Sequence, residues 1–179
     1  MLITHRGLSG PAILKLSAYG ALEFARCNYK FHIEINLVNE PFQDVLDQLK
    51  EFKVTRRKKL VQKNSPLDLS KRLWRNLVLA AGIKEDKRWA DLNSKQIESL
   101  AGQLTKATFE VRGKSTYKEE FVTAGGIDLK EIDFRTFESR LHKNLYFAGE
   151  ILNIDAVTGG FNFQNAWTGA YVAALAISR

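Results

Sequence analysis

The sequence has few of the features of a secreted, disulfide-stabilised or membrane protein. It holds a single cysteine, Cys27, which excludes an internal disulfide and any cysteine-based zinc cluster. No apolar run approaches the ~20 residues that a membrane helix needs, and the N-terminus lacks the basic head and apolar core of a secretory signal. These absences favour a reducing, cytoplasmic setting with no membrane partner and no metal.

Acidic residues are fewer than basic ones: the sequence contains 20 Asp and Glu and 27 Lys and Arg, which gives a formal charge of +7. Such a balance raises nucleic acid as a partner, and the excess is concentrated in Lys53–Lys63 (KVTRRKKLVQK). However, no aromatic residues interleave this run as single-strand stacking requires. A solvated helix face or loop is therefore favoured and nucleic acid is not expected, with a basic nucleic-acid-binding module through Lys53–Lys63 as the alternative function.

The polar and apolar pattern predicts an α+β fold. Residues 29–37 alternate between apolar and polar, as in a half-buried strand. Between residues 39 and 106 the period becomes helical, with three short amphipathic helices, the second expected to start at an N-cap on Ser65 and to end before Gly82. Short strands at 108–111 and 120–124 are expected to pair around Gly113.

The C-terminal end, residues 144–179, carries the strongest functional pattern. A short apolar run, 145–148, is predicted as a strand that leads to Gly149 and Glu150, and a polar loop then reaches Gly159 and Gly160 before a helix rich in Ala and Gly. Glycine lets the backbone approach a ligand, and a helix N-terminus offers free N–H groups and positive potential. The order is typical of a site for a flat, phosphate-bearing cofactor, although composition alone favours a solvated strand-end acid for Glu150.

The last helix contributes small and aromatic residues to this pattern. Gly169 in its middle predicts close contact with a neighbouring element. Phe161, Phe163 and Trp167 are expected to be core residues or apolar walls beside a cofactor, and core is favoured for each alone. Asn162 is expected to cap the helix or to bind the edge of a heterocycle.

Three motifs in this order resemble one family of proteins: THRGLSGPAIL at 4–14, VTAGGI at 122–127 and LYFAGEILNIDAVTGGFNFQNAW at 145–167. Together they resemble bacterial NAD(P)/FAD-dependent oxidoreductases of the aminoacetone-oxidase and bile-acid-reductase type, over essentially the whole chain. The resemblance implies a two-part FAD domain interrupted by a β-rich domain and a helical insertion. Residues 1–38 would belong to the β-rich domain, 39–107 to a helical subdomain and 108–179 to the returning part of the FAD domain.

The resemblance also implies roles for individual residues. Gly149 and Glu150 would lie at the ribityl and pyrophosphate region of FAD. The turn Thr158–Asn162, with Gly159, Gly160 and Phe161, would present backbone N–H groups to the flavin pyrimidine edge. Thr123, Gly125 and Gly126 would form another wall. NAD(P)H and a small-molecule substrate are implied as partners, whereas no catalytic residue is identified.

One hallmark of such proteins is missing from the sequence. The dinucleotide fingerprint G-x-G-x-x-G, which holds the ADP half of FAD, does not occur. The chain is therefore expected to be the C-terminal part of a longer protein, whose missing N-terminal FAD-domain segment would be its partner. Alone it is expected to bind FAD weakly or not at all and not to be a competent enzyme; a remnant without any ligand is a further alternative.

Overall fold

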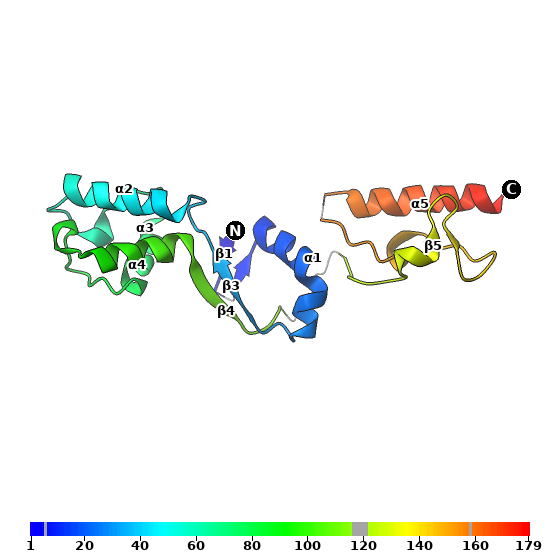
Figure 1. Ribbon diagram of the computed structural model, residues 1–179, viewed down its shortest axis with the longest axis horizontal. Coiled ribbons are helices and arrows are strands. Elements are labelled where there is room, and N and C mark those ends of the chain that lie inside the picture. The colour runs from blue at the N-terminus through cyan, green and yellow to red at the C-terminus, as the bar shows by residue number, and fades with distance from the viewer. Residues whose placement is uncertain (6, 116–121, 158) are drawn as a thin grey trace. The chain divides into compact units, whose positions relative to one another are not determined.

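The computed structural model describes residues 1–5, 7–115, 122–157 and 159–179. These residues form five α-helices and three two-stranded sheets, which confirms the α+β fold class (Figure 1). They separate into two compact units, one of residues 31–111 and one that combines residues 1–30 with 112–179. The assignment of 1–38, 39–107 and 108–179 to parts of a larger flavoprotein remains a prediction.

The unit of residues 31–111, here called the helical module, begins and ends in paired strands. β3 (Phe31–Ile35) lies antiparallel to β4 (Ala107–Val111), and Phe31 faces Val111. Half-buried and exposed residues alternate along β3, as the period-two pattern predicts. β4 therefore pairs with β3 and not with residues 120–124, of which 120 and 121 lie outside the described residues and 122–124 form no strand.

Three helices fill the helical module between these strands: α2 (Phe42–Thr55), α3 (Lys71–Ala80) and α4 (Ser94–Thr105). Short 3₁₀ turns, η1 (Val61–Lys63) and η2 (Trp89–Asp91), connect them (cyan to green in Figure 1). The i, i+3, i+4 spacing gathers the apolar residues of α2 and α4 on one face of each helix; Val45, Leu46 and Leu49 of α2 and Ile97, Leu100, Ala101 and Leu104 of α4 are buried, and Phe42 is half-buried. Two tryptophans at the centre of this core, Trp74 and Trp89, stack with ring centroids 6.3 Å apart.

The start of α3 differs from the predicted start at Ser65. The Ser65 hydroxyl accepts a hydrogen bond from Leu67 N and donates one to Leu67 O, so it closes a local turn instead of capping a helix. Ser70 caps α3 by accepting from Leu73 N. The predicted end is correct, because Gly82 follows the helix with a φ of +75°.

The second unit begins with a hairpin and a helix. β1 (Leu2–Ile3) pairs with β2 (Leu8–Ser9), and α1 (Pro11–Arg26) follows. Pro11 occupies the first helical position, as expected from its fixed φ, and α1 buries none of its residues.

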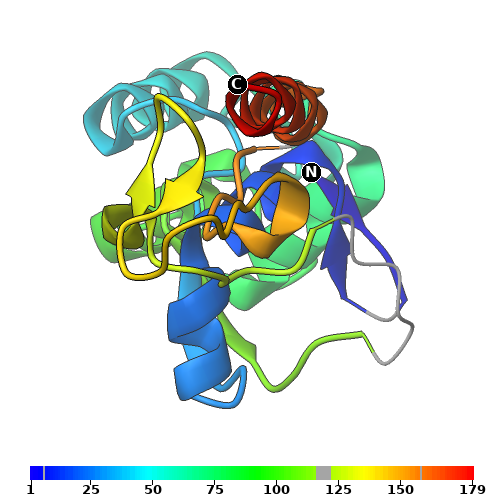
Figure 2. The same cartoon turned by 90° about the vertical axis from the view of Figure 1, so that its right-hand side faces the viewer.

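The remainder of this unit is a small layered structure beneath the last helix. It consists of η3 (Leu129–Glu131), the hairpin β5 (Ile132–Asp133) and β6 (Glu138–Ser139), η4 (Gly149–Ile151) and α5 (Phe161–Ile177). The hairpin is the yellow pair of arrows in Figure 2. The core of this part of the unit, between the hairpin, the loop at η4 and α5, is formed by Ile132, Phe137, Leu152 and Ala173. Within the described part of the chain, no helix has both the length and the apolar character to cross a bilayer.

Candidate functional site

Two of the glycine motifs lie side by side in the structure. Ile127 bridges Leu152 in parallel, Ile127 N donates to Ile151 O at 2.9 Å and Asn153 N donates to Ile127 O at 3.0 Å. Gly126 has a φ of +138°, and a Cβ on it would lie 2.5 Å from Ile151 O. A glycine is required at this position, because any side chain would separate the two motifs.

The second of these motifs turns sharply at Gly149. Its φ is +85°, Leu152 N donates to Gly149 O, and the buried Leu152 side chain anchors the turn. Glu150 lies at the tip of the turn and its side chain is exposed.

The segment before this turn, residues 145–148, is not the regular strand that the sequence predicts. Ser139 N donates to Leu145 O and Phe147 N donates to Phe137 O, while Tyr146 forms an isolated antiparallel bridge to Glu138. Residues 145–148 therefore run along the β5–β6 hairpin. Glu150 consequently follows an irregular edge segment and does not lie at the carboxyl end of a parallel strand, where open α/β sheets place ligand-binding groups.

The third motif begins α5. Gly160 is the N-cap residue, with a φ of +96° and no side chain that caps the helix. The Asn162 side chain holds the preceding loop: its Oδ1 accepts from Ala156 N at 2.8 Å and its Nδ2 donates to Ala156 O at 2.9 Å. The amide group of Asn162 is thereby used within the protein. The first N–H groups of α5 remain without a side-chain cap and can face an acceptor.

These motifs come together as one candidate site, because η4 contacts α5 and is followed directly by Leu152, the bridge partner of Ile127. We call it the glycine site: Gly125, Gly126, Gly149, Glu150 and 159–162. At Gly125, Gly149 and Gly160 no atom lies within 4 Å of where a Cβ would be, so a planar ligand can approach the backbone there. Thr123 is exposed beside Gly125, and Thr158 lies outside the described residues.

The glycine site fits the predicted cofactor in kind. Backbone N–H groups at a helix start, left-handed glycines with open space and an exposed carboxylate suit the carbonyls and hydroxyls of FAD. No residue is assigned to the ADP half of FAD, because the dinucleotide fingerprint does not occur in the sequence.

The hairpin beneath α5 fixes the position of that helix. Phe137 is buried with a φ of +59°, and its ring lies against Gly169, where a Cβ would be 2.7 Å from the Cε1 atom of Phe137. The predicted close contact at Gly169 is confirmed. Phe134 packs edge-on against Phe137, with ring centroids 5.5 Å apart, and is itself 45% exposed.

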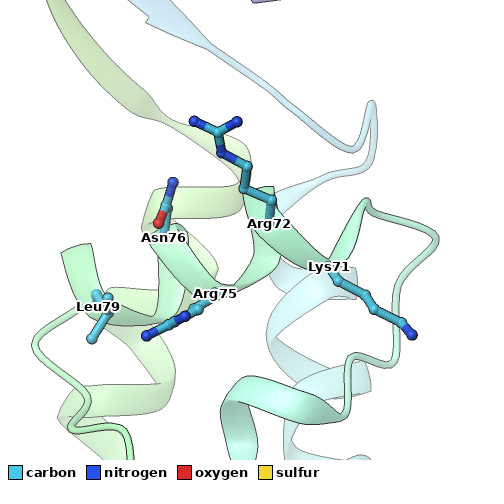
Figure 3. Close-up of a pocket in the computed structure, with 5 residues that line it drawn as sticks. All are labelled: Lys71, Arg72, Arg75, Asn76 and Leu79. Atoms are coloured by element: carbon cyan, nitrogen blue, oxygen red, sulfur yellow. The ribbon is translucent and has the colours of Figure 1, made fainter.

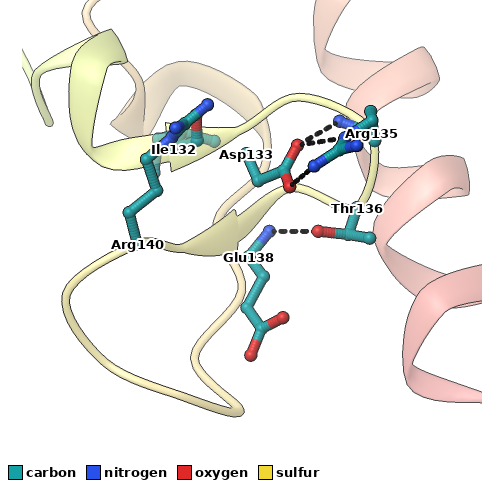
Figure 4. Close-up of polar contacts among 6 residues, drawn as sticks. All are labelled: Ile132, Asp133, Arg135, Thr136, Glu138 and Arg140. Atoms are coloured by element: carbon teal, nitrogen blue, oxygen red, sulfur yellow. Dashed lines mark hydrogen bonds and ion pairs between the residues drawn. The ribbon is translucent and has the colours of Figure 1, made fainter.

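An aspartate–arginine pair holds the turn that carries Phe137 (Figure 4). Asp133 Oδ1 accepts from Arg135 N and Nε, and its Oδ2 accepts from Arg135 Nη2 at 2.9 Å. These hydrogen bonds from Arg135 lower the pKa of Asp133 to about 2. Asp133 therefore remains ionised as a structural clamp at neutral pH.

The outer face of α5 is apolar and uncovered. Phe161, Phe163 and Trp167 are 66%, 63% and 67% exposed, so none of them is a core residue, contrary to the favoured expectation. Phe163 and Trp167 stack with centroids 6.0 Å apart. Because α5 contains no charged residue, this face has the character of a surface that another apolar surface covers.

A second feature, on α3, was not identified from the sequence. A shallow hollow of about 550 Å³ is lined by Lys71, Arg72, Arg75, Asn76 and Leu79 (Figure 3). Arg75 pairs with Glu85 at 2.7 Å, and these contacts lower the pKa of Glu85. The i, i+1, i+4, i+5 spacing of the polar residues on α3 is the signal that could have revealed this basic face.

The fold and the glycine site define an α+β protein in which glycine-rich turns and a helix start come together. The sequence profile described as HI0933-like protein barrel and H2TH domain matches residues 1–122. The chain belongs to this family.

Similar proteins extend the comparison over the whole chain. A protein of Haemophilus influenzae named ribosomal RNA dihydrouridine synthase is 34% identical over 100% of the chain and 42% of its own length. One of the same name from Escherichia coli K12 is 34% identical over 97% of the chain and 41% of its length. A 3-dehydro-bile acid delta(4,6)-reductase of Clostridium scindens is 25% identical over 97% of the chain and 42% of its own length.

These findings support a family of flavoprotein-related oxidoreductases and agree with the resemblance inferred from the three motifs. The chain spans about two-fifths of the length of the relatives it matches. The profile match ends at residue 122 and so does not include the glycine site, which only the relatives cover.

Proposed function

We propose that this chain completes the flavin site of an FAD-dependent oxidoreductase and that the whole protein reduces uridine in ribosomal RNA. The observation that carries the flavin part is the convergence of the glycine motifs: residues 125–127 pair with 151–153, and η4 packs on α5. The substrate is supported by the two relatives that are 34% identical, both named ribosomal RNA dihydrouridine synthases.

The residues of the glycine site would hold FAD by its polar groups. Glu150 would accept a hydrogen bond from a ribityl hydroxyl beside Gly149, and Thr123, Gly125 and Gly126 would wall the pocket. The backbone of Thr158–Asn162 would donate to the pyrimidine edge, where the positive end of α5 stabilises negative charge. FAD, when bound and reduced by NAD(P)H, would supply the hydride that adds to one carbon of the C5–C6 double bond of uracil, and a proton from solvent would add to the other carbon.

An N-terminal FAD-domain segment, outside these 179 residues, is proposed as the partner of the exposed α5 face. The chain spans 42% of the Haemophilus relative, and the uncovered aromatic side chains of α5 are suited to burial against the remainder of such a protein. Alone, the chain would lack the cradle for the ADP half of FAD. We therefore expect the purified chain to bind FAD weakly or not at all; a yellow protein with stoichiometric FAD would contradict this.

A chimera tests both parts of the proposal. This chain replaces the matching 41% of the Escherichia coli relative in cells that lack their own copy. We expect the purified chimera to contain FAD and the ribosomal RNA of these cells to contain dihydrouridine, measured by mass spectrometry of nucleosides. The intact relative is the positive control, and a chimera with Gly126→Val, which separates the paired motifs, is the negative control.

The two readouts separate the possible failures. A folded chimera without flavin would refute the flavin site. A flavin-loaded chimera that leaves the RNA unmodified would refute the RNA substrate. In the latter case a small-molecule reductase becomes the better assignment, as the relative named 3-dehydro-bile acid delta(4,6)-reductase suggests.

A further inference from the structure

We infer that the helical module carries a docking surface for the phosphate backbone of RNA, formed by Arg56, Arg57, Lys58, Lys59 and Arg88. We call this set the basic strip. The inference rests on the proposed function for the identity of its partner, but the surface is argued from the helical module alone.

The positive charge of the chain is concentrated in one stretch of the helical module. Residues 53–88 contain 12 Lys and Arg but only three acidic residues, Asp68, Glu85 and Asp86. The net charge of this stretch, +9, exceeds the +7 of the whole chain. The rest of the chain is therefore close to balanced, and long-range attraction of an anion is directed at this module.

Folding brings Arg88 next to the four consecutive basic residues Arg56–Lys59. Leu60 forms an antiparallel bridge with Arg88. Trp89 N donates to Lys59 O and Ala90 N donates to Arg57 O, both at 3.0 Å. The turn at 56–59 and the segment 87–90 are thus joined through their backbones, which places Arg88 beside the run although about 30 residues separate them in sequence.

The backbone under the basic strip is held rigidly by buried side chains. Trp89 is fully buried, packs edge-on against Phe52 at 5.1 Å and donates its Nε1–H to Asn64 O. Lys53, on the helix just before the strip, donates its Nζ–H to Leu92 O at 2.6 Å and is not available to a ligand. A turn held in this way loses little further freedom when a partner binds.

The cations of the basic strip are available to an external anion. All five residues are exposed, and no ion pair joins any of them to an acid among the described residues. The acid beside them in the fold, Asp91, accepts from the backbone N of Arg88. By contrast, Arg26, Arg75 and Arg135 are each paired with a carboxylate.

The chemistry of the basic strip selects phosphate rather than bases. It offers guanidinium and ammonium donors, which suit phosphate oxygens, and it contains no exposed aromatic ring on which a base could stack. We therefore expect charge-driven binding with little sequence preference, which would orient a structured RNA while another part of the protein selects the uridine.

Binding of the 179-residue chain to a ribosomal RNA transcript, measured over a series of salt concentrations, tests the inference. The strip variant carries Arg56→Gln, Arg57→Gln, Lys58→Gln and Lys59→Gln. The matched control carries Lys30→Gln, Lys95→Gln, Lys130→Gln and Lys143→Gln, which removes the same charge from exposed positions outside the stretch 53–88.

We expect the strip variant to bind about 100-fold more weakly and the slope of log K against log salt to fall by about 3, since each lost phosphate contact removes ~0.7 from the slope. The control should change little. Arg56→Lys with Arg57→Lys should retain most of the affinity, because charge is preserved. If the fourfold strip variant unfolds at a lower temperature than the control, Arg88→Gln alone replaces it, with a proportionately smaller loss.

Several results would overturn the inference. The first is an equal loss of RNA affinity in the strip variant and in the matched control. The second is a loss of RNA affinity only in a variant with Lys71→Gln and Arg72→Gln on α3. The third is binding of the chain to anionic phospholipid vesicles but not to RNA. The proposed function can fail separately. If the chain binds RNA through the basic strip but the chimera makes no dihydrouridine, the proposed reaction is refuted and the RNA-binding role of the strip stands. If a chimera with the strip substitutions still makes dihydrouridine and the strip variant binds RNA with unchanged affinity, the RNA-binding role of the strip is refuted and the proposed reaction stands.

Discussion

The ring of Phe137 fills the space that a side chain on Gly169 would need. Alanine at this position would gain about 1 kcal/mol of helix propensity, but its Cβ would lie 2.7 Å from a buried ring, and such overpacking costs about 1–3 kcal/mol. We expect Gly169→Ala to lower the free energy of unfolding by about 1 kcal/mol, measured by urea denaturation.

Gly102 in α4 is the matched control for this substitution. Nothing lies within 4 Å of the position that its Cβ would take. Gly102→Ala should therefore raise the free energy of unfolding by about 0.5–1 kcal/mol. Stabilisation by both substitutions would show that the Phe137 ring moves aside easily.

The carboxylate of Asp133 makes stability depend on acid pH. Its folded pKa is about 2 against an ordinary value of 3.8, so its contribution is complete above pH ~4 and is lost as the pH falls towards ~2. We expect the difference in melting temperature between the native chain and Asp133→Asn to shrink over this window. In Arg135→Gln the pKa of Asp133, followed by NMR, should rise towards its ordinary value; an unchanged pKa would assign the shift to another group.

Individual residues also show what sequence reasoning could and could not predict. Gly169 was identified from the sequence itself, because a glycine in the middle of a helix indicates close approach, whereas Gly126 was singled out through the family resemblance. Ser65 misled the prediction of α3, because a serine can cap a helix or close a local turn and its own sequence does not distinguish the two. Phe161, Phe163 and Trp167 were expected in a core, but apolar composition does not say which polypeptide covers a surface.

At the scale of elements, α5 has one packed face and one exposed apolar face. Gly169 and Ala173 are buried, whereas Trp167 and Tyr171 are each 67% exposed. We expect Trp167→Gln with Tyr171→Gln to change the free energy of unfolding by less than about 0.5 kcal/mol, as is usual for exposed positions. Self-association, measured by size-exclusion chromatography with light scattering, should decrease.

A clear drop in stability in this α5 variant would contradict the exposed placement of the two rings. Ala173→Gln is the comparison, since it places a larger polar side chain in the buried face and should destabilise the unit strongly. In the chimera, the α5 variant should instead weaken flavin retention, because there the face is expected to be covered.

Elements with strong local signals were predictable from the sequence, and those set by distant pairing were not. The capping box of α4, with Asn93 and Gln96, follows from local chemistry. The partner of β4 does not, because β3 lies more than 70 residues earlier and alternation specifies a buried face rather than a neighbour. The same limit hid the position of Arg88 beside the basic run.

At the scale of the whole molecule, the helical module has a core of its own. Every residue of its buried cluster lies between Val45 and Leu104. We expect residues 31–111, expressed alone, to unfold cooperatively with a clear transition in near-UV circular dichroism, because Trp74 and Trp89 are held in that core. A gradual loss of signal would mean that the core depends on the other unit.

The strand pair that closes the helical module has a consequence for how the protein could have been assembled. Because Phe31 faces Val111 across β3 and β4, the chain enters and leaves at one point, and a short β-turn could join the flanking residues directly. The module has the geometry of a removable cassette. A host protein could acquire or lose it in one genetic step without changing the path of its own backbone.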